Sequence, residues 1–362
     1  MRRMRVIVLA ACVAGAALLL LTGAGSSEKA AGTPSAEQPS AAQTAKTIKI
    51  VMPDGAPLLS LAKMRAENFV IENGYAVSYE TLPTADLLTA ALMNGEADFA
   101  VAPINVCSVM YNGGKGYRLA GVSIWGIMHI VSNQAGTLTP DSLKGQTVLA
   151  FTKGGTPGIT LRSILTQNGI DYVEQDIATP VPSNAVNIVY LNAADEVKNA
   201  LVAGKLNEVE IKYALLPEPV ATAIAGATSN KYSAKINVQT EWEKANGGAR
   251  YPQAGLIFHE RLLENDAAFV DKCIALAEMS TGWAFDNPLR AGTLAKDVLK
   301  SNGIPGGAPV QAAVRAGRLP LQFVYADEAK DAVSAYLEII RKENPTLIGG
   351  KLPDEAFYYR SR

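Results

Sequence analysis

Two short turns in the sequence have the composition of ligand-binding loops. The chain reads Gly-Ala-Pro at residues 55–57 and Gly-Thr-Pro at residues 155–157, and each motif follows a short apolar run. Glycine lets a ligand approach the backbone closely, and proline is favoured in the first turn of a helix. Exposed N–H groups at a helix start suit anionic or carbonyl-bearing ligands. The two turns therefore indicate non-covalent binding of a small molecule, unless they serve only to start helices.

Two polar side chains follow the third apolar run in each half of the chain. Asn105 comes after Pro103, and Glu218 comes after Pro217. An asparagine amide offers both a donor and an acceptor, whereas a glutamate would receive an N–H or a cationic group. Capping of a helix start is the alternative role for both residues. If Glu218 faces the ligand, its charge disfavours nitrate or sulfate and favours an amine or a heterocyclic N–H.

Trp125 and Asn192 complete the set of candidate contacts. Trp125 stands where a β-rich run ends, so its ring is placed to stack on a planar ligand, with core packing as the alternative. Asn192 follows the apolar run that ends at Leu191. We expect His129 and His259 to be structural. The candidate ligand-binding residues are Gly55, Ala56, Asn105, Trp125, Gly155, Thr156, Asn192 and Glu218.

Motifs for other chemistries are missing from the sequence. No Gly-x-Gly-x-x-Gly follows a strand pattern, and the chain contains neither a P-loop motif nor Gly-x-Ser-x-Gly nor His-Glu-x-x-His. Two histidines and three cysteines leave little material for a metal site. We therefore expect no catalytic residue, no metal site and no cofactor.

The elements that would position the candidate residues follow an α/β pattern. From residue 47 short apolar runs alternate with longer amphipathic ones, which is typical of α/β proteins with mostly parallel sheets. Strands are expected at residues 47–52, 75–81, 98–102, 146–151, 186–191 and 210–216. Helices are expected at residues 58–73, 84–93, 159–168 and 194–203. Most candidate contacts then follow the carboxyl end of a strand, where open α/β sheets bind ligands.

The chain contains an internal recurrence that predicts two lobes. The order strand, turn, helix of the first half returns about a hundred residues later, although any α/β chain repeats such units. β-rich runs at residues 117–132 and 251–258 connect the halves, and the chain after residue 258 is nearly all helical. Two connections predict that the second lobe is inserted into the first. The expected first lobe is 47–132 plus 253–362, and the expected second lobe is 133–252.

The N-terminal residues have the pattern of an export signal. Three arginines precede an uncharged apolar run at residues 6–21, which is shorter than a membrane-spanning helix. We expect a signal peptide over residues 1–24, with an uncleaved N-terminal anchor as the alternative. Residues 25–46 lack bulky apolar side chains and are expected to form a disordered tether. Ala24 occupies the position of the lipid-bearing cysteine in a lipoprotein signal, so no lipid can be attached there. The expected location is the periplasm or the outer face of the cell membrane.

The charge balance argues against a nucleic-acid-binding protein. The chain has 33 Lys and Arg against 34 Asp and Glu, a formal net charge of −1. Nucleic-acid-binding domains usually carry a clustered basic excess. Residues 1–46 hold five basic and two acidic side chains, so the remaining 316 residues carry 28 basic and 32 acidic ones. We therefore expect a mildly acidic body, with a net charge of −4, that binds no nucleic acid.

Five short motifs carry a resemblance to a known family. They are GEADFA at 95–100, LKGQTV at 143–148, KGGTP at 153–157, LLPEP at 215–219 and YPQAGL at 251–256. In this order and spacing, over residues 49–342, the chain resembles the substrate-binding proteins of ABC importers of the nitrate/sulfonate/taurine type, a group that includes binders of thiamine-precursor pyrimidines. The resemblance implies a two-lobed periplasmic-binding-protein type 2 fold of the α/β class. Each lobe would be a mixed, mostly parallel sheet flanked by helices, with the ligand cleft between the lobes.

The same resemblance implies a function. It implies an extracytoplasmic protein that captures a small organic nutrient by hinge closure and delivers it to a complex of ABC permease and ATPase. The nutrient would be a sulfonate, a nitrate-like anion or a heterocyclic vitamin precursor, and the protein would be a monomer. The alternative is an enzyme of a vitamin-precursor pathway on the same two-lobe fold. The export signal argues against that alternative, because such enzymes work on cytoplasmic metabolites.

Overall fold

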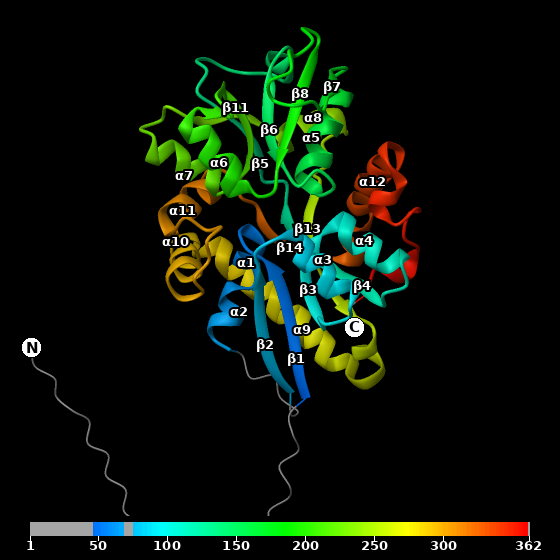
Figure 1. The fold of residues 1–362 in the computed structure, drawn as a ribbon. Helices are drawn as coiled ribbons and strands as arrows, with labels where there is room; N and C mark the ends of the chain where they lie inside the picture. Colours follow the sequence, from blue (N-terminus) through cyan, green and yellow to red (C-terminus); the bar gives the residue numbers. More distant parts are fainter. Residues whose placement is uncertain (1–45, 69–74, 361–362) are drawn as a thin grey trace, which may run out of the picture. The chain divides into compact units, whose positions relative to one another are not determined.

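Two six-stranded mixed sheets form the framework of the fold (Figure 1). The computed structural model describes residues 46–68 and 75–360. The predicted signal peptide (1–24) and the predicted tether, up to residue 45, lie outside the described residues. Within the described ranges, no helix is long and apolar enough to span a bilayer.

The first sheet has the strand order β14-β4-β13-β3-β1-β2. Its strands are β1 (Lys46–Pro53), β2 (Tyr75–Leu82), β3 (Phe99–Pro103), β4 (Tyr117–Trp125), β13 (Pro252–His259) and β14 (Leu321–Tyr325). The helices of this half are α1 (Ala56–Ser60), α2 (Ala62–Ala66), α3 (Ala85–Met93), α4 (Ile104–Asn112), α9 (Arg261–Asp286), α10 (Pro288–Thr293), α11 (Gly307–Arg315) and α12 (Ala326–Glu343). The inner strand β3 is buried along nearly its whole length, as expected for a strand in a sheet covered by helices.

The second sheet has the strand order β12-β5-β11-β6-β8-β7. Its strands are β5 (Met128–Ser132), β6 (Thr147–Phe151), β7 (Asp171–Val173), β8 (Ala185–Leu191), β11 (Tyr213–Pro217) and β12 (Ser233–Asn237). The helices of this half are α5 (Thr156–Gln167), α6 (Ala194–Ala203), α7 (Val220–Ala227) and α8 (Val238–Ala245). The predicted α/β class, with two mixed sheets flanked by helices, is confirmed. The sheets are not mostly parallel as expected, because five of the ten strand pairs that the described residues form in them are antiparallel.

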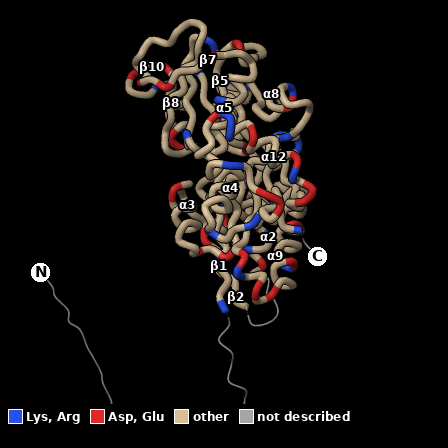
Figure 2. The backbone as a smooth tube through the Cα atoms, turned by 90° about the vertical axis from the view of Figure 1, so that its right-hand side faces the viewer, with Lys and Arg blue, Asp and Glu red and all other residues tan. Residues whose placement is uncertain are grey.

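Local capping signals explain where several helices begin and end. The Thr84 hydroxyl accepts a hydrogen bond from the Leu87 N–H at the start of α3, and Gly95 takes a positive φ of 68° just beyond its end. In α12 two acidic residues occupy the first turn and two basic residues occupy the last turn, which complements the helix dipole. Basic and acidic residues are otherwise interspersed along the described chain (Figure 2).

The chain crosses from the first sheet to the second between Trp125 and Met128. Strand β5, which the sequence pattern assigned to the first lobe, pairs with β11 and β12 of the second sheet. Gly126 in the crossing has no room for a side chain, because a Cβ there would lie 2.1 Å from Gln239 Oε1 and 2.4 Å from Tyr251 Cε1. All antiparallel pairs of the two sheets involve β4, β5 or β13, the strands that lead into or out of the crossings.

Two element predictions differ from the structure. The helix expected at 58–73 is divided into α1 and α2, because Leu61 leaves helical geometry with φ −110° and ψ 7°. The C-terminal part expected to be nearly all helical contains the strand β14, which pairs with β4. A five-residue strand between two helices forms because a distant strand pairs with it. Its alternation of apolar and polar residues is too short to distinguish it from a loop in the sequence.

Candidate functional site

The carboxyl ends of the parallel strands in the two sheets face each other. Strand β3 ends at Pro103 and leads directly into α4, and β6 ends at Phe151 and leads through a short loop into α5. The Asn105 side chain joins these two places, because its Nδ2 donates to the carbonyl oxygen of Gly154 at 3.2 Å. Open α/β sheets bind ligands beyond such strand ends. We therefore take this junction, the inter-sheet site, as the candidate functional site.

Asn105 is a buried polar side chain of the inter-sheet site that two hydrogen bonds hold in place. Only 3% of the residue is exposed, and Nδ2 donates to both Gly154 O (3.2 Å) and Leu347 O (3.3 Å). Leu347 belongs to a short 3-10 helix, η3 (Pro345–Ile348), that follows α12. The Asn105 Oδ1 atom is buried and has no hydrogen-bond partner. Since buried amide oxygens normally accept a hydrogen bond, this atom marks a place for a donor.

The turn before α5 forms the opposite side of the inter-sheet site. Gly155 is the N-cap of α5, and no side chain caps this helix. Its first N–H groups have no partner within the helix. Thr156 is fully buried, and its hydroxyl donates to the Gln253 carbonyl oxygen at 3.4 Å. The Gln253 side-chain oxygen Oε1 is buried without a partner, like Asn105 Oδ1.

Unpartnered polar atoms gather at this edge of the two sheets. Eight side-chain atoms in the described part of the chain are buried without a hydrogen-bond partner. The β3–β13 and β5–β11 registers put the starts of β13 and β5 beside the carboxyl ends of β3 and β11. Five of the eight atoms belong to residues at these strand ends: Asn105, His129, Arg250, Tyr251 and Gln253. Groups of this kind in a protein interior usually bind ordered water or a ligand.

Trp125 packs where the chain crosses between the sheets. The residue is 5% exposed, and its Nε1 donates to the Gln322 carbonyl oxygen at 3.1 Å. The Arg250 guanidinium lies 4.7 Å from the ring centroid and so covers one face of the indole. Arg250 Nη1 also donates to Gln322 Oε1 at 2.9 Å. This face of Trp125 is thus occupied by protein.

Glu218 is engaged by an ion pair that links the two halves. The residue is completely buried, and Oε1 lies 2.6 Å from Nε of Arg318, which follows α11 in the first half. The Thr222 N–H and hydroxyl each donate to the carboxylate at 3.0 Å. Glu218 therefore accepts an N–H from the first turn of α7 and has its charge balanced, so its carboxylate is not a free acceptor for an amine.

Gly55, Ala56 and Asn192 lie outside this group of contacts. Gly55 has a φ of 107° and packs against Gly303, where an added Cβ would lie 2.9 Å from the Gly55 Cα. The Asp54 carboxylate accepts N–H groups from the same loop, which covers the start of α1. Asn192 is exposed, and its N–H donates to Glu196. Of the eight predicted contacts, the structure brings Asn105, Gly155 and Thr156 together.

Sequence reasoning missed Gln253 and Leu347 as parts of this site. Gln253 lies inside the motif YPQAGL, but only the pairing of β13 with β3 shows that it lies near the end of β3, where α4 begins. Leu347 contributes its backbone carbonyl, which has no signature in the sequence. Both residues are separated from Asn105 by more than a hundred positions, so no local pattern connects them.

Arg162 fastens α5 to α12 beside the inter-sheet site. Its Nε donates to Glu343 Oε1 at 2.5 Å, and its Nη1 donates to the Lys153 carbonyl at 3.0 Å and the Tyr190 hydroxyl at 2.8 Å. The residue is 5% exposed, so these contacts compensate a buried charge. The guanidinium is therefore a structural link and is not free to bind an anion.

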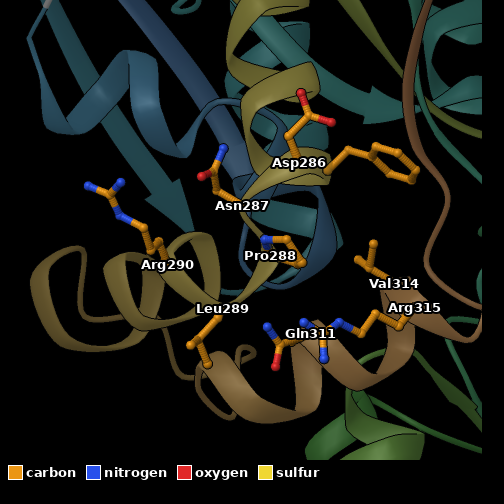
Figure 3. A pocket seen from close by; sticks show the side chains of 9 residues that line it. Asp286, Asn287, Pro288, Leu289, Arg290, Gln311, Val314 and Arg315 are labelled. Carbon is orange, nitrogen blue, oxygen red and sulfur yellow. The ribbon is translucent and has the colours of Figure 1, made fainter.

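A separate surface pocket lies at the end of α9, against α10 and α11 (Figure 3). Its volume is about 610 Å³, and its walls include Phe285, Pro288, Leu289 and Val314. Arg315 projects along its floor near Gln311 (Figure 3). None of the residues predicted from the sequence lines this pocket.

A buried histidine at the inter-sheet site gives the protein a predictable acid sensitivity. Burial lowers the pKa of His129, which stands near Glu218 and Arg318. An unfolded histidine binds its proton near pH 6.5, so below that pH the unfolded chain holds more protons than the folded one. The wild-type protein should therefore lose unfolding free energy between pH 7.5 and pH 5.5, and we expect this loss to be smaller in His129→Gln. One titrating group contributes at most about 1.4 kcal/mol per pH unit.

The measurement is the free energy of unfolding in urea at both pH values. His259→Gln is the matched comparison, because burial also lowers the pKa of His259, which is only partly buried, and we expect a smaller change. Equal pH dependence in the wild-type protein and in His129→Gln would contradict the assignment.

Comparison with known proteins identifies the fold. No protein-family model and no curated protein sequence matches the chain. Many solved structures resemble it, among them the following three. An ABC transporter protein from Parabacteroides distasonis is 23% identical with a TM-score of 0.68, covering 88% of this chain and 100% of its own. The alkanesulfonate-binding protein SsuA from Xanthomonas axonopodis pv. citri, bound to MOPS, is 16% identical with a TM-score of 0.60. The match covers 86% of this chain and 96% of that chain.

The third is the periplasmic aliphatic sulphonate binding protein SsuA from Escherichia coli. It is 13% identical with a TM-score of 0.62, and the match covers 88% of this chain and 93% of that chain. At these identities the likeness concerns the fold. The chain therefore has the fold of the periplasmic binding proteins, as the sequence motifs predicted.

Proposed function

We propose that the protein is the extracytoplasmic solute-binding component of an ABC importer. It would hold a small organic molecule at the inter-sheet site and deliver it to a permease and ATPase complex. The observation that carries the proposal is the group of buried, unpartnered polar atoms at the facing strand ends. The fold shared with two sulfonate-binding proteins supports it and agrees with sulfonates as one of the expected ligand classes.

We propose that each sheet with its helices acts as one lobe. Strand β5 then belongs to the second lobe, and the hinge consists of the crossing at Gly126 and Ile127 together with the segment that leads into β13. Ligand release would separate contacts that join the two halves, among them Asn105 with Gly154, Glu218 with Arg318 and Arg162 with Glu343. The predicted ligand contacts at Asn105, Gly155 and Thr156 keep that role in this proposal.

The site is better suited to binding than to catalysis. Asn105, Thr156 and Gln253 offer amide, hydroxyl and backbone groups, none of which titrates near neutral pH, and burial lowers the pKa of the nearby His129 below its ordinary value. General acid–base catalysis requires a group that exchanges a proton in that range. The neighbouring Glu218 is committed to Arg318 and Thr222. We therefore propose binding without chemical change and without a cofactor.

The N-terminal sequence supports export of this protein. Three arginines and the apolar run at 6–21 would direct secretion, and cleavage after Ala24 would release a chain without a lipid. The proposed location is the periplasm or the outer face of the cell membrane. We propose that the mature protein works there as a monomer.

The proposal predicts strong stabilisation by the correct ligand. A ligand present at 100 times its Kd raises the free energy of unfolding by about 2.7 kcal/mol. We would screen the mature protein by thermal shift against sulfonates, nitrate, amino acids and heterocyclic vitamin precursors. Mass spectrometry of the recovered ligand should show it unchanged. A chemically altered product would contradict the proposal, as would a screen without any stabilising compound.

Two variants connect that screen to the inter-sheet site. Asn105→Ala should abolish the ligand-induced shift, because Asn105 joins α4 to the turn before α5. Asn192→Ala is the matched control, since Asn192 is exposed and lies outside the contacts of the site. Equal shifts in both variants would place the ligand elsewhere.

A further inference from the structure

We infer that the ligand of the inter-sheet site presents N–H donors, as a primary amide or an amino-substituted heterocycle does. This inference rests on the proposed binding function and specifies the ligand class. It comes from the two side-chain atoms that flank the turn before α5 without partners, Asn105 Oδ1 and Gln253 Oε1. Both are carbonyl oxygens, which accept hydrogen bonds and cannot donate them.

The orientation of the Asn105 amide is fixed by its neighbours. Nδ2 contacts two carbonyl oxygens, those of Gly154 and Leu347, so it must be the nitrogen that faces them. Turning the amide around would set Oδ1 against both carbonyl oxygens. Oδ1 therefore points to the remaining side, and the residue is only 3% exposed, so bulk water does not replace a partner there.

Gln253 brings a second acceptor to the same turn. Its backbone carbonyl accepts from the Thr156 hydroxyl, which places β13 directly against the start of α5. The residue is 8% exposed, and Oε1 is buried without a partner. Asn105 contacts this turn at Gly154 and Gln253 contacts it at Thr156. A ligand seated here would meet the acceptor of Asn105 and, beside it, the Gln253 amide, whose Nε2 no hydrogen bond holds in place within the described residues.

The donors of the site require an acceptor on the same ligand. The first N–H groups of α5 lack partners within the helix, and no side chain caps them. Arg250 Nη2 is also buried without a partner, while Nη1 is held by Gln322. A carbonyl oxygen, a ring nitrogen or a carboxylate would satisfy these donors. The ligand class is thus a small molecule that carries N–H donors together with an acceptor.

Donor-free anions fit this arrangement poorly. Nitrate and simple alkanesulfonates present only acceptor oxygens, which would lie against Asn105 Oδ1 and Gln253 Oε1 and leave both unpaired. Two of the three arginines beside the site are already neutralised, Arg318 by Glu218 and Arg162 by Glu343. The third, Arg250, forms no salt bridge within the described residues and would attract an anionic group of the ligand, but it leaves both side-chain oxygens without a donor. An unpaired buried polar atom lowers affinity by roughly tenfold or more. We therefore expect a donor-free anion to bind more weakly than an N–H-bearing compound by about that factor for each side-chain oxygen that it leaves unpaired.

Matched compounds test the inference by isothermal titration of the mature protein. The pairs are cytosine with N4,N4-dimethylcytosine and nicotinamide with N,N-dimethylnicotinamide, and the donor-free anions are ethanesulfonate and nitrate. We expect an N–H-bearing compound to bind and its dimethylated partner to bind at least tenfold more weakly. Binding of ethanesulfonate or nitrate as tight as that of the N–H-bearing compounds would overturn the inference and leave the proposed function standing. If no compound of the thermal-shift screen binds, both the proposed function and this inference are contradicted.

A variant of Gln253 separates hydrogen bonding from shape. Gln253→Met keeps the length of the side chain and removes its oxygen, so the N–H-bearing compound should bind roughly tenfold more weakly. The affinity for ethanesulfonate should not fall with the same substitution. Gln311→Met is the control, because Gln311 lines the separate surface pocket (Figure 3). Unchanged affinity in Gln253→Met, with unfolding stability equal to that of the control, would contradict the role of this oxygen.

Discussion

Arg318→Met is expected to lower the free energy of unfolding by about 3 kcal/mol. The substitution removes the cation from a completely buried carboxylate, since Glu218 has no exposed side-chain surface. Breaking a buried pair by deleting one partner leaves an uncompensated charge and typically costs about 3 to 5 kcal/mol. We place this case at the lower end, because Thr222 still donates two hydrogen bonds to the carboxylate. Urea unfolding at neutral pH measures the change.

The control for this prediction comes from the same region of the chain. Arg315 ends α11, is exposed, and belongs to no ion pair within residues 46–68 and 75–360, so Arg315→Met should change the stability by about 0.5 kcal/mol or less. The double variant Arg318→Met with Glu218→Gln should be less destabilised than the sum of the single changes, with a coupling of roughly 1 to 3 kcal/mol. Additive single effects would show that the pair does not link the two halves energetically.

Phe357→Ala is expected to cost about 3 to 5 kcal/mol of stability. Phe357 is completely buried, lies in the short 3-10 helix η4 (Glu355–Phe357), and packs against Tyr111 with ring centroids 5.2 Å apart. The C-terminal segment around it runs over α4, where the Ser108 hydroxyl and Asn112 Nδ2 donate to the Ile348 carbonyl at 2.8 and 2.7 Å. Loss of the aromatic ring therefore leaves a cavity and loosens the segment that positions Leu347.

Arg360→Ala provides the comparison for this segment. Arg360 is 82% exposed and forms a surface ion pair with Asp327, so its removal should cost about 0 to 1 kcal/mol. Differential scanning calorimetry of both variants measures the difference. Because Leu347 holds the Asn105 amide, Phe357→Ala should also weaken ligand binding at temperatures where the variant is folded. A Tm for Phe357→Ala equal to that of Arg360→Ala would contradict the packing described here.

The sequence predicted those parts of the fold that depend on neighbouring residues. Helix α3 was expected at 84–93 and is found at Ala85–Met93, because the Thr84 cap and Gly95 act within one turn of the chain. The turn before α5 was identified for the same reason, since strand, glycine and proline follow each other directly. The structure places Gly155 and Thr156 at the inter-sheet site, and their role as ligand contacts stays a prediction.

The parts that were not predicted depend on distant pairing. Strand β14 exists because it joins β4, and β5 belongs to the second sheet because it pairs with β11 and β12. Glu218 was considered as a ligand contact, but its partner Arg318 lies 100 positions further along the chain. The acceptor Gln253 Oε1 is likewise defined by the register of β13 beside β3. No local periodicity carries this information.

Hydrogen–deuterium exchange tests the central claim most directly, that a small molecule binds at the inter-sheet site. The experiment compares the mature protein with and without the compound that stabilises it most in the thermal-shift screen. The account predicts slower exchange of backbone amides at the starts of α4 and α5 and at the start of β13. Slower exchange confined to the end of α9, α10 and α11, around the surface pocket of Figure 3, would contradict it.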